Sequence, residues 1–215
     1  KETLSVCKNI KSIFFMDEIF PVKNSFIDEF CEKYKKHINL PFQVTLYPHM
    51  LSEEKIVKLK SAGLMEVTMG LQSGSQRIRN DVYRRKDKNE MLLKENALLS
   101  KHKVMTVYDI IIRNPWETET DLDHSLDLIN KFRYPFYLKM FTLAYYPKHP
   151  ITIRALKEKM VDPKEVDATI GYLDVRPPHK LRVREHYHDD AQFVVWHNRI
   201  RKLMNGEMVP ANFSE

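Results

Sequence analysis

The sequence LMEVTMGLQSGS, residues 64–75, joins a strand-like apolar segment to a short polar segment that carries two of the chain's five glycines. A helix-like segment follows it directly. Glycine permits a sharp turn, or a close approach of the main chain to another group. The positions of Gly70 and Gly74 therefore predict that a strand over residues 64–69 ends in a tight loop. They also predict that Gln72 and Ser73, which lie between the glycines, face a ligand that approaches closely.

Strand-like and helix-like segments alternate on both sides of this stretch. Short continuous apolar runs, typical of strands buried on both faces, predict strands over residues 12–16, 42–46, 64–69, 104–112 and 137–143. Capping residues and apolar spacing predict six helices. The first begins at Ser25 and has an acidic first turn, and the others begin at or near Ser52, Gln76, Asn89, Glu119 and Ile151. The alternation predicts right-handed βαβ units around a parallel sheet. The sequence contains no dinucleotide-binding glycine pattern, which favours a barrel or partial barrel over a doubly wound sheet.

Length and composition suit one domain, or one domain with a tail. The chain has 215 residues, 43% of them apolar, and a formal net charge of +6. Its apolar runs are much shorter than the roughly 20 residues that span a membrane, and its polar start has no secretory apolar region. Cys7 and Cys31 form no CxxC pattern, so a disulfide framework is not expected and the cytoplasm is the default compartment. The positive charge is dispersed, as on a solvated surface, and no nucleic-acid-binding motif accompanies it.

Polar or conformationally special residues follow each predicted strand. In barrels of parallel strands, the chemistry takes place on the loops at the carboxyl ends of the strands. Any one of these clusters could be explained as a helix cap, but five clusters at one rim together predict a ligand site. They are Asp17-Glu18, residues 47–49, residues 72–75, residues 113–118 and residues 145–147.

Five blocks of the sequence resemble, in order and spacing, the radical S-adenosylmethionine (radical SAM) superfamily. They are FFMDEIF, MGLQSGSQRI, VYRR, YDIIIRNPWETETDLDHSL and FTLAYYPKHP, within residues 12–155. The resemblance is strongest to the branch whose members often carry an upstream cobalamin-binding domain. It implies an α/β fold, a partial (β/α)6 TIM-like barrel, with strands two to six in residues 1–160. A mostly helical C-terminal extension, residues 161–215, would pack on this barrel.

The resemblance also implies where S-adenosylmethionine would be held. Asp17 and Glu18 match the position that meets its amino group, and Gln72 and Ser73 match the block that contacts the ribose. Arg84 or Arg85 matches the arginine that pairs with the methionine carboxylate, a task that suits a guanidinium. The remaining matches lie along the adenine or near the substrate: Ile112, Asn114, Pro115 and Tyr146. Glu117 and Thr118 are expected to begin the following helix, and no metal ligand and no catalytic residue is assigned.

The cluster ligands of such enzymes are missing from this chain. The family binds a [4Fe–4S] cluster through a CxxxCxxC loop after the first barrel strand, and Cys7 and Cys31 are too far apart to replace it. Residues 1–11 have the pattern of the end of a helix, so we expect a fragment whose parent enzyme carries the loop upstream. The parent would cleave S-adenosylmethionine to a 5′-deoxyadenosyl radical for methyl transfer or rearrangement, and the fragment alone would be inactive. A small-molecule substrate, an electron donor such as flavodoxin or ferredoxin, and cobalamin are the implied partners.

Two other functions remain open from the sequence. The chain could be a degenerate barrel that acts as a binding or interaction module, or part of an RNA-modifying enzyme, which only the basic pI of about 9.1 suggests. In the last third, His186 and His188 have the spacing of two metal ligands on one strand face, although a solvated polar segment explains them as well. Residues 193–203 have the pattern of an amphipathic helix.

Overall fold

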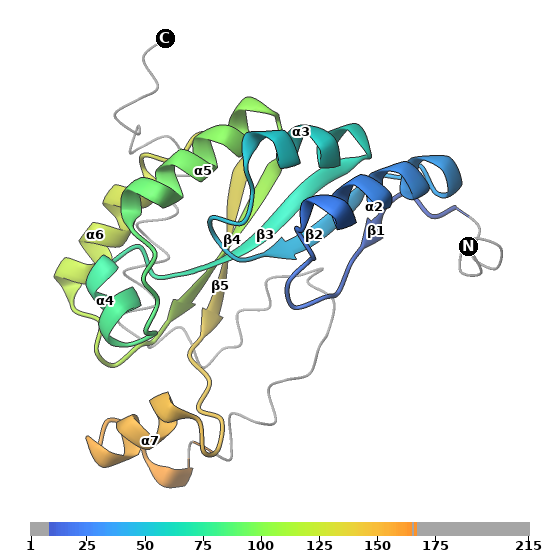
Figure 1. Cartoon of the computed structure of the whole chain (residues 1–215). Helices are drawn as coiled ribbons and strands as arrows, with labels where there is room; N and C mark the ends of the chain where they lie inside the picture. The colour runs from blue at the N-terminus through green and yellow to red at the C-terminus, as the bar shows by residue number, and fades with distance from the viewer. Residues whose placement is uncertain (1–8, 165, 167–215) are drawn as a thin grey trace.

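The computed structural model describes residues 9–164 and residue 166, and these residues form an α/β fold around one parallel sheet (Figure 1). The strand order is β1-β2-β3-β4-β5, so each strand pairs with its neighbour in the sequence. The strands are β1 (Ile13–Phe14), β2 (Phe42–Leu46), β3 (Leu64–Gln72), β4 (Met105–Ile112) and β5 (Phe136–Thr142). The helices are α2 (Asn24–His37), α3 (Glu53–Ser61), α4 (Gln76–Asp81), α5 (Asn89–Lys101), α6 (Glu119–Ile129) and α7 (Pro150–Lys157). This sequential order is that of an opened barrel and confirms the predicted fold class.

Most helix starts were predicted correctly, because several of these helices begin at a serine or threonine whose side chain caps the first turn. The Ser52 and Ser75 hydroxyls accept from backbone N–H groups of α3 and α4, and Thr118 forms a reciprocal capping box with Asp121 at α6. Helix α2 is present as predicted, but its predicted cap and acidic first turn were wrong. Its N-cap is Lys23, Ser25 lies inside the helix, and the first turn holds no acidic residue.

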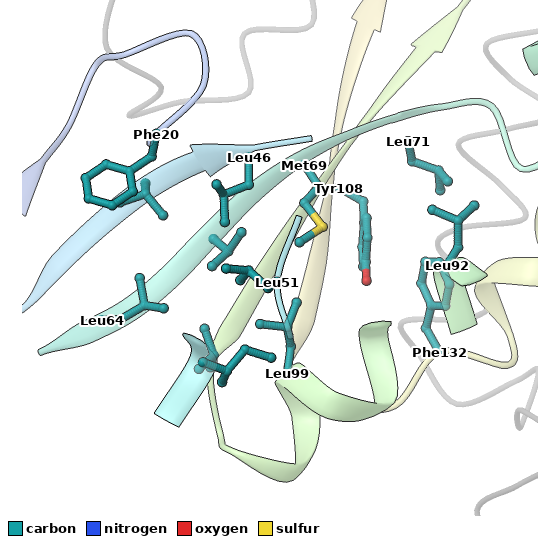
Figure 2. Packing of buried hydrophobic residues seen from close by; sticks show 14 of the residues in the cluster. Phe20, Leu46, Leu51, Leu64, Met69, Leu71, Leu92, Leu99, Tyr108 and Phe132 are labelled. Atoms are coloured by element: carbon teal, nitrogen blue, oxygen red, sulfur yellow. The ribbon is translucent and has the colours of Figure 1, made fainter. Parts of the chain in front are cut away.

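The hydrophobic core lies between one face of the sheet and four helices. Side chains from α2, α3, α5 and α6 join a single cluster with alternate strand residues such as Val67, Met69 and Tyr108. Figure 2 shows Leu64, Met69 and Tyr108 on the same side of the sheet as these helices. Burial on this face fixes the register of each strand, because a slip of one residue would turn these side chains outward.

The opposite face of the sheet carries the other half of each strand. Glu66, Thr68 and Gly70 alternate with core residues in β3, and the paired register places Asp109 beside Gly70 and Lys139 beside Asp109. We call this the inner face, because it lines the inside of an opened barrel. Phe14 and Phe141, near its two edges, are 44% and 49% exposed.

A second, smaller cluster lies beyond the carboxyl ends of the strands. Ile151 and Ala155 of α7 pack with Ile78 of α4 and with Leu143 and Tyr145, which follow β5. In Figure 1, α7 lies below the carboxyl end of β5, away from the helices α2, α3 and α5. The cluster therefore brings α4 and α7 together at the end of the sheet where ligands are expected.

Several predictions fall on residues that the structure does not describe. They concern Cys7, the helical ending over residues 1–8, His186, His188, the helix over 193–203, and residues 167–215 of the predicted extension. Within the described residues, no helix combines the length and apolarity that a membrane span requires.

Candidate functional site

Strand β3 does not end where the sequence predicted. It continues past Met69 to Gln72, and its register with β4 shifts between Gly70 and Gln72. Gln72 has φ of 66°, in the left-handed region. An irregularity of this kind re-aims a side chain at the end of a strand. Apolar periodicity cannot reveal it, because the bulge depends on main-chain geometry, and this is why the predicted strand was three residues too short.

Gly70 leaves room for two polar side chains on the inner face. A Cβ atom at this position would lie 2.3 Å from Nε2 of Gln72 and 3.2 Å from Nη1 of Arg85. Both nitrogens therefore lie directly over the Gly70 main chain. The close approach predicted for Gly70 is real, and side chains of this chain make it.

The two candidate arginines lie in different surroundings. Arg85 stacks over the Tyr47 ring at 4.3 Å and donates through Nε to Asp87 Oδ2 at 2.8 Å. Its Nη2 is buried and has no hydrogen-bond partner among the described residues. Arg84 is exposed and has φ of 52°. A buried donor without an acceptor is costly, so an anionic group is best accommodated at Arg85.

Asp109 is a site residue that the sequence reasoning missed. It pairs in register with Gly70, its neighbours Tyr108 and Ile110 belong to the core, and its own side chain therefore lies on the inner face. Burial raises the pKa of Asp109 to about 6, although the positive charge of Lys139 lowers it in part. Its Oδ1 is buried without a hydrogen-bond donor in the described part of the chain. A lone carboxylate within the apolar run TVYDIII was the available signal.

Gln72, Arg85 and Asp109 together form the candidate site. Their positions are linked through Gly70, which lies beneath the Gln72 and Arg85 side chains and beside Asp109 in the sheet. The site therefore offers an amide, a cationic donor and a carboxylate acceptor at the carboxyl half of two central strands. This combination suits a ligand that has both an acidic group and hydroxyl groups.

Ser73 has a different environment from the one predicted. It is 1% exposed, donates to Glu117 Oε1 at 2.9 Å, and lies 3.3 Å from the Ser125 hydroxyl. Ser75 donates to Asp121 Oδ1 at 2.7 Å. The serines thus connect the end of β3 to α6, and any contact of Ser73 with a ribose would have to use its main chain.

Gly74 was predicted to make room for a ligand, and this explanation was wrong. A Cβ atom there would lie 2.4 Å from Cα and 2.8 Å from the carbonyl oxygen of Ser125. Gly74 is therefore required for the close packing of the β3 end against helix α6. The group that approaches Gly74 is this helix, and a ligand is not needed to explain the glycine.

Arg79 is a second residue that the sequence reasoning overlooked. It is 0% exposed and donates to the carbonyl oxygens of Ser73, at 2.7 Å, and Asp87, at 3.1 Å. It also bonds the Asn89 side chain. A buried arginine needs its charge and donors satisfied, and here it joins the β3 end to the loop that carries Arg85.

The remaining predicted site residues are spread along the rim. Asp17 and Glu18 are exposed in the loop after β1, and Tyr146, 41% exposed, precedes α7. Ile112 points into the helix-side core, and Asn114 is fully buried, where it donates to the Tyr83 hydroxyl. Pro115, which is partly exposed, follows Asn114. Near an adenine, the 112–115 segment would therefore act mainly through its main chain and Pro115.

The buried Glu117 gives a prediction about pH. Burial raises its pKa to about 7 from 4.5, while the hydrogen bond from Ser73 lowers it. The folded state therefore favours the protonated acid, and this stabilisation is present below pH 4.5 and lost as the pH rises through 7. Between pH 5 and 8, we expect the unfolding free energy of the wild type to fall by about 2–3 kcal/mol more than that of the Glu117→Gln variant. Urea unfolding at several pH values measures this difference, and parallel pH profiles would contradict it.

The residues that the structure describes do not fit an iron–sulfur cluster. Their one cysteine, Cys31, is buried in α2 and its sulfur contacts the Lys58 carbonyl oxygen at 3.5 Å. Within the same residues no group of three or more His, Cys, Asp or Glu could hold a metal ion. Cys31 alone therefore does not offer the set of neighbouring thiolates that a cluster needs.

Comparisons with solved structures identify the fold. The radical S-adenosylmethionine methyltransferase TsrM from Kitasatospora setae, with cobalamin and a [4Fe–4S] cluster bound, matches with a TM-score of 0.58 and 16% identity over 73% of this chain. Coproporphyrinogen III oxidase (HemN) from Escherichia coli, described as a radical SAM enzyme, matches with a TM-score of 0.52 and 15% identity over 76%. The matches cover 30% and 40% of those chains. No family model and no curated protein sequence matches. The chain therefore has the fold found in radical SAM enzymes, and it spans less than half of their length.

Proposed function

We propose that this chain binds S-adenosylmethionine and forms the barrel portion of a radical SAM enzyme. The observation that carries the proposal is a pair of unsatisfied side-chain atoms from two residues that neighbour Gly70. Among the described residues, Arg85 Nη2 lacks an acceptor and Asp109 Oδ1 lacks a donor. A ligand with a carboxylate and a ribose would satisfy both, and the fold is one that such enzymes use.

Each part of the ligand has a group of matching chemistry at the rim. The methionine carboxylate would bind Arg85 through two parallel N–H donors. The ribose hydroxyls would donate to Asp109 and to the Gln72 amide oxygen. The exposed carboxylates of Asp17 and Glu18 suit the ammonium group, while the 112–115 main chain and Tyr146 would lie along the adenine.

The chemistry of the chain itself is binding and orientation of this ligand. In the radical SAM family a [4Fe–4S] cluster supplies the electron that cleaves S-adenosylmethionine, and the described residues provide no thiolate set for it. We propose that the parent enzyme obtains the cluster from other residues and performs methyl transfer or rearrangement on a small molecule. An associated cobalamin and an electron donor belong to the same proposal, and the chain alone would be inactive.

Calorimetry of the 215-residue chain tests the proposal. The probes are S-adenosylhomocysteine, which keeps the carboxylate and ribose, and 5′-methylthioadenosine, which lacks the amino-acid part. We expect saturable binding of both, with S-adenosylhomocysteine binding tighter by roughly tenfold because a charged hydrogen-bonded pair contributes about 1.5–3 kcal/mol. Absence of binding at millimolar concentrations of either probe would refute ligand binding by this chain.

The role of Asp109 predicts a pH-dependent affinity for adenosine. We expect Asp109→Asn to weaken adenosine binding about fivefold at pH 8, because a charged acceptor is replaced by a neutral one. In the wild type, affinity should fall as the pH drops through about 6, where burial places the Asp109 pKa. The variant should show no such fall. 2′-Deoxyadenosine is the matched control ligand, and an equal loss of affinity for both nucleosides would contradict a contact to the 2′-hydroxyl.

A further inference from the structure

Asp87 occupies the centre of a buried polar arrangement that the predicted site did not include. The residue is 5% exposed, and its Oδ2 accepts from Arg85 Nε at 2.8 Å. Its other carboxylate oxygen lies 3.4 Å from His49 Nε2. Its backbone carbonyl accepts from Arg79 Nε at 3.3 Å and Nη2 at 3.1 Å. Both the main chain and the side chain of Asp87 are thus held in place.

His49 is itself fixed from a separate element. Its backbone N–H donates to Glu95 Oε2 at 2.7 Å, and its ring Nδ1 lies 4.0 Å from the same oxygen. Glu95 belongs to α5 and is 5% exposed. His49 has φ of 72°, a strained conformation for a residue with a side chain. The loop after β2 and the loop before α5 are therefore joined through His49 and Asp87.

These contacts determine how the Arg85 guanidinium is presented. Asp87 engages Nε, and the Tyr47 ring covers one face of the group at 4.3 Å. Nη1 lies over Gly70, and Nη2 is buried without a hydrogen-bond partner in the described part of the chain. Asp87 thus occupies Nε, and Nη2 keeps its donors for an incoming carboxylate.

We propose that Asp87, whose Oδ2 accepts from Arg85 and whose other oxygen lies beside His49, is the positioning residue that holds Arg85 ready to bind the carboxylate of the ligand. This inference rests on the proposed function. It adds that Asp87 and Arg85 together recognise the amino-acid end of the ligand. Preorganised groups bind more tightly because less side-chain entropy is lost on binding. Loss of Asp87 should therefore affect ligands that have a carboxylate and spare those that lack it.

The binding experiment compares two ligands and two variants of the 215-residue chain. We expect Asp87→Ala to weaken S-adenosylhomocysteine binding about tenfold and 5′-methylthioadenosine binding less than about twofold. Asp81→Ala, which removes an exposed acid at the end of α4, is the control and should change neither affinity. In an Arg85→Ala background, Asp87→Ala should have no further effect, because the two act as one unit. Equal losses for both ligands, or additive losses in the double variant, would overturn the positioning role.

A second measurement tests the same contact without any ligand. In protein labelled with ¹⁵N-arginine, the Nε–H of Arg85 should exchange slowly with water and show restricted rotation. Asp87→Ala should abolish this protection, and Asp81→Ala should leave it intact. Retained protection in Asp87→Ala would overturn the inference even if neither ligand bound. Protection lost as expected, with no ligand bound by the wild type, would instead refute the proposed function and leave the Arg85–Asp87 contact established.

Discussion

Gly74→Ala is expected to lower the free energy of unfolding by about 3 kcal/mol, at the upper end of the usual cost of overpacking. The added methyl group would lie 2.4 Å from Cα and 2.8 Å from the carbonyl oxygen of Ser125, both main-chain atoms of α6. A helix backbone cannot move aside as a flexible side chain can. The end of β3 and helix α6 would have to separate, which would also strain the hydrogen bonds that Ser73 and Ser75 make there. Thermal unfolding should show a fall in Tm of about 6–12 °C.

Gly70→Ala provides the matched control, since it adds the same methyl group four residues earlier. Its close neighbours are the ends of the flexible Gln72 and Arg85 side chains. We expect a loss of less than about 1 kcal/mol of stability, together with weaker binding of S-adenosylhomocysteine, because both side chains proposed to bind the ligand must shift. Equal loss of stability in the two variants would contradict the distinction between a packing glycine and a site glycine.

The fold could be predicted from the sequence because its main determinants are local. Continuous apolar runs such as residues 42–46 indicated buried strands, and β2 has these same bounds. Side-chain caps at Ser52 and Thr118 marked helix starts. At α2 the N-cap Lys23 makes no side-chain capping hydrogen bond, so no side chain indicated the start of the helix and the predicted cap was wrong.

The candidate site was only partly predictable, because its decisive features depend on contacts between distant segments. Gln72 and Arg85 were identified, but only the structure separates Arg85 from its exposed neighbour Arg84. Asp109 was overlooked because the residue lies within a strand, and only the pairing with Gly70 shows that it faces the site. The hydrogen bond that buries the Ser73 side chain could not be predicted either, since its partner Glu117 lies 44 positions away in the sequence.

The largest expected effect on ligand binding belongs to Arg85→Ala. We expect it to weaken binding of S-adenosylhomocysteine by about 10–100-fold, because a bidentate charged contact contributes about 1.5–3 kcal/mol. The Nη2 atom that has no acceptor among the described residues would be the donor lost. Binding of 5′-methylthioadenosine, which has no carboxylate, should change less than about twofold. Calorimetry on both ligands gives the ratio directly.

Arg84→Ala is the control that makes the assignment specific. It removes an identical charge from the adjacent residue, so any effect of the protein's net charge on a ligand that carries a carboxylate is the same in both variants. Arg84 is exposed, whereas Arg85 is held over Tyr47 and Gly70. We therefore expect Arg84→Ala to bind both ligands within about fivefold of the wild type, since an exposed charge contributes at most about 1 kcal/mol. A large loss of S-adenosylhomocysteine affinity in Arg84→Ala, with little change in Arg85→Ala, would reverse the assignment. It would mean that the segment between α4 and α5 rearranges when the carboxylate binds.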